Sequence, residues 1–178
     1  MVVYTIGHGT RPLDELVAML SAAGVQTLVD VRRFPGSRRN PQFNRGTLEA
    51  ALAAAGIAYR HAVDLGGRLA DEPGEERFHC IRVPAFRAYA ARMGTPGWQD
   101  ALAAALAEPV PALLCSETPW TKCHRRLIAD CCTPGATRSG TSSARAAPSR
   151  TYPGRCRKHA RDGSTSAASS WPRNIRPA

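Results

Sequence analysis

Five residues that can take part in chemistry lie within eleven positions of the chain. They are Cys115, Glu117, Cys123, His124 and Arg125. An apolar run precedes them and an amphipathic segment follows, which predicts a strand, a loop and a helix. In an open α/β sheet, ligands bind beyond the carboxyl ends of the strands, where the next helix offers free backbone N–H groups. We therefore expect this loop to form part of a binding or catalytic site.

Two earlier segments place polar residues in the same way. A β-prone run over residues 2–6 leads to His8. A second expected strand over residues 25–31, with Leu28, Val29 and Val31 among its apolar residues, delivers Asp30 and Arg32. Such a pattern is typical of a strand buried on both faces of a parallel sheet. His8 is interpreted either as a turn residue or as a site residue. Asp30 is interpreted as a site carboxylate, the alternative being a structural pair with a neighbouring arginine.

An arginine-rich loop follows the second expected strand. Residues 32–45 hold five arginines, two aromatic residues and no acid. Arginine forks suit phosphate oxygens, and Phe34 or Phe43 has a face on which a base can stack. A solvated basic loop is the alternative, but the concentration of arginine favours an anion-binding loop.

The remaining pattern completes an alternation of strands and helices. It predicts helices over residues 10–23, 47–55, 86–93 and 98–106 and strands over residues 57–61 and 111–115. A long irregular connection over residues 64–84 is expected to cover the site. We predict an α/β fold, a three-layer sandwich with a mostly parallel central sheet.

The formal charge of +10 is concentrated at the end of the chain. Residues 131–178 hold 9 of the 24 basic residues and 1 of the 14 acidic residues, so residues 1–130 carry a net charge of only +2. The end segment is rich in Ser, Thr, Pro, Gly and Arg, and such a composition cannot bury enough apolar surface to fold. We predict one domain over residues 1–130 and a disordered, low-complexity basic tail over residues 131–178. No apolar run is long enough to span a membrane and no export signal is apparent, so we expect a cytoplasmic protein.

The tail also carries the mark of a frameshift. The helix that starts near Cys123 is interrupted after Asp130, where Cys131 and Cys132 replace the continuation of its apolar face. Aspartate codons end in a pyrimidine and cysteine codons are TG plus a pyrimidine. The frame that starts one base earlier must therefore read Leu-Leu after Asp130, which restores the apolar periodicity. A natural basic arm is the alternative.

Short motifs in order along residues 1–130 resemble the domain of unknown function 488 family. They are Thr5-Ile6-Gly7-His8, Leu28-Val29-Asp30-Val31-Arg32, Pro35-x-Ser37, Tyr59 with His61, Leu65-Gly66-Gly67, Phe86-Arg87-x-Tyr89-Ala90 with Met93, Leu114-Cys115-x-Glu117 and Cys123-His124-Arg125. The resemblance implies an α/β domain whose motif residues gather in one cleft, and it implies no reaction. Family members usually continue the last helix and add a strand with a His-Ile or His-Leu pair. That strand is missing from this sequence, which would leave a sheet edge exposed.

Three classes of function remain open. The leading hypothesis is a hydrolase of an N-glycosidic or phosphoester bond in a nucleotide or nucleic acid, with Asp30 and Glu117 as catalytic carboxylates. The second is an enzyme that uses a thiol or zinc, with Cys115 as nucleophile and His124 as base, or with these two residues, Cys123 and His8 as zinc ligands. The third is a nucleic-acid-binding module without catalysis. Buried hydrophobic packing is the ordinary alternative for the cysteines.

The spacing of these cysteines and His124 matches no recognised structural zinc pattern, so the sequence assigns neither metal ligands nor a cofactor. Arg32 and Arg125 are expected to hold phosphate, and Tyr59 or Tyr89 to stack on or orient a sugar. Arg87 and Tyr89 also have an ordinary interpretation as a surface arginine and a core tyrosine. The full set of predicted substrate-binding residues is His8, Arg32, Ser37, Tyr59, Arg87, Tyr89, Cys123 and Arg125.

Overall fold

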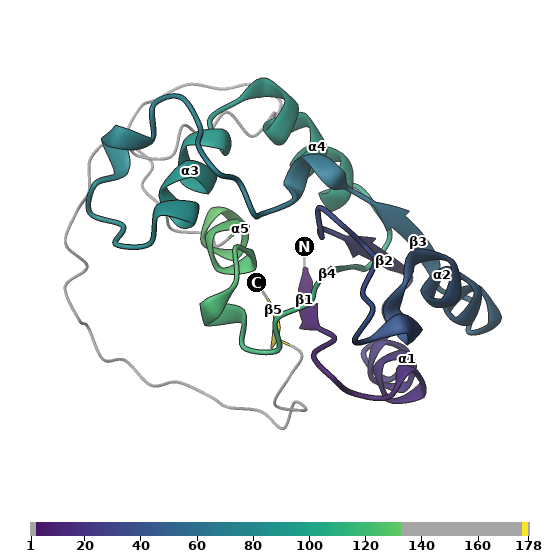
Figure 1. Ribbon diagram of the computed structural model, residues 1–178. Coiled ribbons are helices and arrows are strands. Elements are labelled where there is room, and N and C mark those ends of the chain that lie inside the picture. The colour runs from purple at the N-terminus through teal and green to yellow at the C-terminus, as the bar shows by residue number, and fades with distance from the viewer. Residues whose placement is uncertain (1–2, 133–175, 178) are drawn as a thin grey trace, which may run out of the picture.

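A computed structural model describes residues 3–132 and 176–177, and these residues form an α/β fold. Four parallel strands make the sheet in the order β3, β2, β4, β1 (Figure 1). Their bounds are β1 (Tyr4–Gly7), β2 (Thr27–Asp30), β3 (Ala58–His61) and β4 (Pro111–Cys115). The short strand β5 (Arg176–Pro177) pairs antiparallel with β1. The predicted fold class is therefore confirmed.

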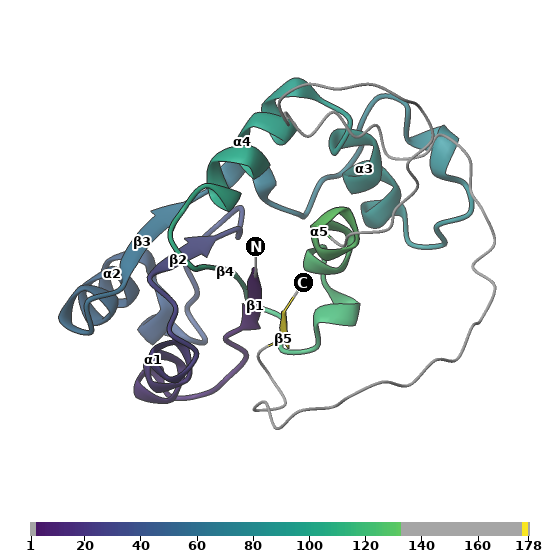
Figure 2. The same ribbon diagram turned by 180° about the vertical axis from the view of Figure 1, so that it is seen from behind.

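Five helices cover the two faces of this sheet (Figures 1 and 2). On one face lie α1 (Leu13–Ala22) and α2 (Arg45–Ala54), and on the other lie α3 (Pro84–Arg92), α4 (Pro96–Leu106) and α5 (Arg125–Cys132). Each face has its own apolar core, which gives the three layers that the sequence predicts.

The alternation of side chains along the strands explains why both faces need helices. Leu28 and Val29 are adjacent in β2 and both are fully buried, but Leu28 packs with the α1 and α2 side while Val29 packs with the other core. Successive side chains of a strand point to opposite faces of the sheet. Because all four long strands are parallel, Gly7, Asp30 and Cys115 lie at the same edge of the sheet, where their strands end.

The helix bounds differ from the predicted ones by at most three residues. The structure starts α3 at Pro84 and α4 at Pro96, before the apolar periodicity that predicts them. Proline fits the first turn of a helix because its missing N–H has no partner to lose there. These starts could have been read from the prolines.

The predicted tail falls mostly on residues 133–175 and 178, which lie outside the described residues. The frameshift and the predicted disorder therefore stay predictions. Within the described part of the chain, β5 occupies the edge of β1 that the sequence analysis expects to lack a strand. No helix among the described residues is long and apolar enough to cross a membrane.

Candidate functional site

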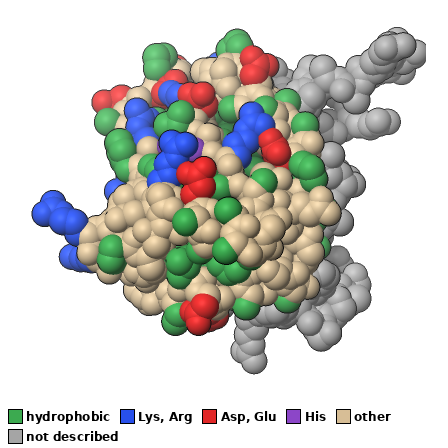
Figure 3. Space-filling model, turned by 90° about the vertical axis from the view of Figure 1, so that its right-hand side faces the viewer, with side chains coloured by type: hydrophobic (Ala, Val, Ile, Leu, Met, Phe, Trp, Pro, Cys, Tyr) green, Lys and Arg blue, Asp and Glu red, His purple; other side chains and the backbone are tan. Residues whose placement is uncertain are grey.

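A cavity of about 590 Å³ opens at the carboxyl edge of the sheet. Five of its lining residues are cationic and one is acidic, Glu117. The cationic residues are Arg32, Arg33, Arg39, Arg68 and Lys122. Figure 3 shows one face of the molecule on which Lys and Arg side chains lie near a small patch of His, with Asp and Glu side chains among them, so the positive excess is a property of the cavity lining. Such an excess of positive charge attracts an anionic ligand.

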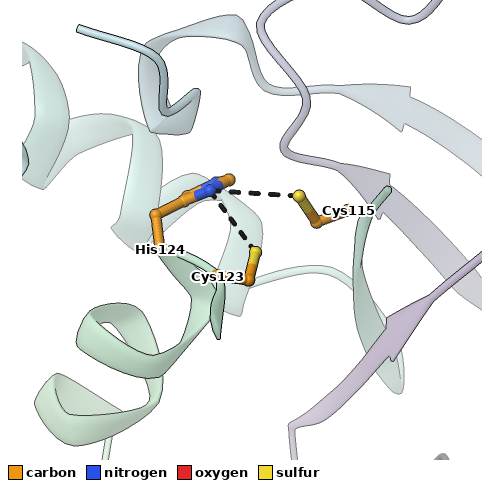
Figure 4. Close-up of side chains that lie close together, drawn as sticks. All are labelled: Cys115, Cys123 and His124. Carbon is orange, nitrogen blue, oxygen red and sulfur yellow. Dashed lines mark hydrogen bonds between the residues drawn. The ribbon is translucent and has the colours of Figure 1, made fainter. Parts of the chain in front are cut away.

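Two thiols and an imidazole meet in the wall of this cavity (Figure 4). Cys115 ends β4, and Cys123 and His124 lie just before α5. The Nδ1 atom of His124 is 3.9 Å from the Cys115 sulfur and 3.5 Å from the Cys123 sulfur. Both cysteines are free thiols, and all three residues are at least nine-tenths buried.

Three contacts fix the orientation of His124. Its Nε2 atom lies 3.2 Å from the carbonyl oxygen of Val31. Because a carbonyl only accepts, Nε2 must carry a hydrogen, and a neutral ring then presents a lone pair on Nδ1 to the two sulfurs. The ring of Tyr89 packs against the imidazole at a centroid distance of 5.0 Å. Gly67 also packs against the ring, so closely that a Cβ added at this residue would lie 2.8 Å from Nδ1.

The two sulfurs differ in acidity. The hydrogen bond from Cys123 is the largest influence that lowers the pKa of Cys115; His124 and the backbone N–H of Glu117 lower it further, against the opposing effect of burial. The same hydrogen bond and burial raise the pKa of the Cys123 thiol. Both shifts favour a proton on Cys123 and a thiolate at Cys115.

The carboxylate of Asp30 is fully buried and fully occupied. Arg32 donates to it through Nε at 2.8 Å and through a terminal nitrogen at 2.5 Å, and the backbone N–H of Arg32 adds a third contact at 3.0 Å. The hydroxyl of Tyr59 donates at 2.8 Å. Asp30 and Tyr59 do not line the cavity. Burial and Asp30 also raise the pKa of Tyr59, so this hydroxyl keeps its proton.

Arg32 connects the buried carboxylate of Asp30 to the cavity wall. Its second terminal nitrogen donates to the carbonyl oxygen of Phe43 at 3.0 Å and to Nε2 of His8 at 3.3 Å. The Nδ1 atom of His8 donates to the carbonyl of Gly9, and its ring stacks on Phe43 at 4.3 Å. Burial is the main cause that lowers the pKa of His8. His8 is therefore a neutral acceptor that helps to hold Arg32.

Arg125 packs against the loop that carries Glu117. Its guanidinium is 1% exposed, donates to the carbonyl oxygen of Glu117, and keeps an Nε atom without a hydrogen-bond partner. Gly7 makes this packing possible, because an added Cβ there would lie 1.9 Å from the same carbonyl oxygen. Arg125 therefore supports the loop and does not line the cavity.

The structure brings eight of the twelve predicted site residues to the cavity wall. They are His8, Arg32, Ser37, Tyr89, Cys115, Glu117, Cys123 and His124. The other four, which the cavity lining does not include, are Asp30, Tyr59, Arg87 and Arg125. Tyr89 lines the wall, but its hydroxyl is already bonded to the carbonyl of Leu65 and to the indole N–H of Trp98.

Sequence reasoning assigned no site role to several wall residues. Gly67 and Arg68 come from the start of the long irregular connection, and Lys122 comes from the loop before α5. The Gly66-Gly67 pair was a usable signal, because a backbone that packs against a side chain this closely needs glycine. Of the two aromatic residues in the arginine loop, Phe34 lines the cavity and is 65% exposed, whereas Phe43 is buried behind His8.

Comparison with known proteins gives a family without an assigned activity. The model of the family described as domain of unknown function DUF488 matches residues 12–132, which is more than half of the chain. No curated protein and no solved structure matches the sequence. The matched range includes the arginine loop, both glycines of the Gly66-Gly67 pair and the Cys115, Cys123 and His124 cluster. This chain belongs to the DUF488 family.

Proposed function

We propose that this chain is a cysteine-dependent hydrolase of a phosphate ester, with Cys115 as nucleophile and His124 as its acid–base partner. The observation that carries the proposal is the buried Cys115 sulfur beside an oriented imidazole in the wall of a cation-lined cavity. A thiolate is the reactive form of cysteine, and a neighbouring base and lowered pKa are what activate it. A cytoplasmic location, where thiols stay reduced, suits this chemistry.

The reaction would proceed in two displacements. The Cys115 sulfur attacks phosphorus, an S–P bond forms, and the P–O bond to the leaving group breaks. The Nδ1 lone pair of His124 first takes the proton of the Cys115 thiol, and the ring then gives this proton to the leaving oxygen. Water then attacks phosphorus, His124 takes a proton from that water, and the S–P bond breaks to release phosphate and the thiolate.

The cavity supports a phosphorylated substrate, and a nucleotide is the class that we favour. The wall has four exposed cationic side chains that form no ion pair with a carboxylate in the described part of the chain: Arg33, Arg39, Arg68 and Lys122. Arginine binds phosphate oxygens with two parallel hydrogen bonds. The exposed ring of Phe34 offers an apolar face beside these cations, on which a base can stack.

The carboxylate hypothesis has less support than the thiol hypothesis. Glu117 lines the cavity and is exposed, but Asp30 has no unoccupied oxygen facing it, since Arg32 and Tyr59 hold both of its oxygens. A general base needs a free lone pair within reach of the proton that it takes. Asp30 therefore fits a positioning role for Arg32 better than a catalytic one.

Comparison of two serine variants tests the proposal. Purified protein would be assayed with a panel of mononucleotides and aryl phosphates, alongside Cys115→Ser and the control Cys132→Ser, whose thiol lies outside the cavity wall. We expect Cys115→Ser to lose at least about a thousandfold in kcat, because a neutral hydroxyl replaces a thiolate. We expect Cys132→Ser to retain activity, and a quenched wild-type reaction to contain a phosphorylated peptide that includes Cys115.

Two results would overturn the proposal. Turnover that survives in Cys115→Ser but is lost in Glu117→Gln would return the chemistry to the carboxylates. Nucleotide or nucleic-acid binding that weakens with salt, without turnover of any substrate, would indicate the non-catalytic binding module.

A further inference from the structure

Cys123 is close to both members of the proposed catalytic pair, yet the reaction above does not use it. The two sulfurs and a ring nitrogen of His124 all lie within 4.8 Å of one another, and all three residues are buried (Figure 4). Two thiols and an imidazole are the ligand types that proteins use most often for Zn²⁺. His8, which the sequence analysis counts as a fourth candidate ligand, is not part of this group.

The sulfur–nitrogen separations are close to those of a tetrahedral zinc site. With Zn–S bonds of about 2.3 Å and a Zn–N bond of about 2.0 Å, a tetrahedral angle puts sulfur and nitrogen about 3.5 Å apart. The sulfur–Nδ1 separations are 3.5 Å for Cys123 and 3.9 Å for Cys115. A shift of a few tenths of an ångström at Cys115 would bring its sulfur to the same distance from Nδ1.

The surroundings of His124 also fit a metal ligand. A ligating histidine usually donates its other ring N–H to a carbonyl or carboxylate, which fixes the tautomer and aims the lone pair. The Nε2 atom of His124 does this toward the carbonyl of Val31, so Nδ1 already faces the two sulfurs. Tyr89 and Gly67 both pack against the ring, so the imidazole would need little reorganisation to bind an ion.

We propose that Cys115, Cys123 and His124 form a three-ligand site for Zn²⁺ whose fourth position faces the cavity. All three residues line the cavity wall, so a water molecule or a substrate oxygen can reach the remaining position. Binding releases the proton held by Cys123 and places the Cys115 sulfur on the metal. Zn²⁺ is then a reversible inhibitor of the thiolate reaction, since a coordinated sulfur cannot attack phosphorus.

The inference does not need the proposed reaction, and its main test uses no substrate. Co²⁺ would be titrated into the full chain, because this ion replaces Zn²⁺ and reports its own geometry by absorption. We expect one equivalent to give the intense visible bands of a tetrahedral site and a thiolate-to-metal band in the near ultraviolet. Added Zn²⁺ should remove both.

A matched pair of variants assigns the ligands. Cys123→Ser should lose most of the thiolate-to-metal band and bind Zn²⁺ at least tenfold more weakly, whereas Cys132→Ser should behave as the wild type. A second measurement covers the case in which a variant does not fold. In the wild-type chain, Zn²⁺ should slow the alkylation of both Cys115 and Cys123 by iodoacetamide at least tenfold, and a chelator should restore it.

The proposal is overturned if Co²⁺ gives only the weak bands of an octahedral ion, if Cys123→Ser keeps the wild-type spectrum, or if Zn²⁺ leaves the alkylation rates unchanged. Failure of the phosphatase assay would leave these measurements unaffected. Conversely, Zn²⁺ binding that accelerates turnover, rather than inhibiting it, would overturn the inhibitory role and assign the ion to catalysis.

Discussion

The carboxyl ends of β2 and β4 lie side by side in one sheet, but their polar side chains differ in how fully they are hydrogen-bonded. At β2, every oxygen of the Asp30 carboxylate accepts from Arg32 or Tyr59. At β4, the Cys115 sulfur has weak partners and lies in the wall of an open cavity. Satisfied buried groups rigidify a fold, whereas reactive groups need an unfilled side. We infer that the β2 end supports the structure and the β4 end supplies the reactivity.

The largest expected difference between the two ends is in stability. Asp30→Asn leaves the buried guanidinium of Arg32 without its counter-charge, and breaking a buried pair in this way costs about 3–5 kcal/mol. Urea denaturation should show this loss in the free energy of unfolding. Asp100→Asn, an exposed site in α4, is the control and should change stability little. A stable Asp30→Asn protein that has lost its turnover would instead place Asp30 in the chemistry.

Removal of one donor from the same carboxylate should have a smaller effect. Tyr59→Phe deletes the hydrogen bond to Asp30 but keeps the ring, and hydrogen bonds to charged groups are worth about 1.5–3 kcal/mol. The same denaturation assay would measure the loss. If the nucleotide assay reports activity, we expect kcat to stay within about threefold of the wild type, because Tyr59 does not line the cavity. A large fall in kcat with unchanged stability would contradict the division between the two ends.

The smallest expected change in stability concerns α5, the helix that follows Cys123 and His124. Cys131 and Cys132 are partly buried against the core below α5, where the neighbouring reading frame supplies leucines. Cys131→Leu with Cys132→Leu should raise the free energy of unfolding by about 1 kcal/mol through added apolar burial. Ala53→Leu, at an exposed position of α2, is the control and should give no such gain.

Destabilisation by the leucine pair would count against the frameshift, which sequencing of the DNA through codons 120–178 would test directly. Neither position lines the cavity, so the reactivity of Cys115 should not change in this variant.

The sequence predicts the scaffold well because the scaffold follows from local patterns. Leu28, Val29 and Val31 predict a strand buried on both faces, and the apolar run at residues 111–115 predicts another strand. Both β2 and β4 are buried along their whole length. The family motifs likewise indicate which residues gather at one edge. The loop after β4 was the correct place to look for the cavity.

The state of each polar side chain could not be predicted in the same way. Whether Asp30 is free or saturated depends on Tyr59, which is 29 residues away and reaches it only because β3 pairs with β2. The tautomer of His124 depends on a carbonyl 93 residues away, at Val31. Such contacts follow from the pairing of strands and helices, and no local spacing encodes them.

The rate at which Cys115 is alkylated, followed against pH, tests the central claim most directly. Iodoacetamide would be applied to the metal-free chain, and modification of the Cys115 and Cys132 peptides would be measured by mass spectrometry. Because the folded-state pKa of Cys115 is lowered, its thiolate persists as the pH falls, whereas burial raises the pKa of Cys132. We predict a Cys115 rate that is nearly constant from about pH 7.5 to 5.5, while an ordinary thiol slows by about tenfold per pH unit. A Cys115 rate that falls tenfold per unit over this range would show a protonated thiol and contradict the account.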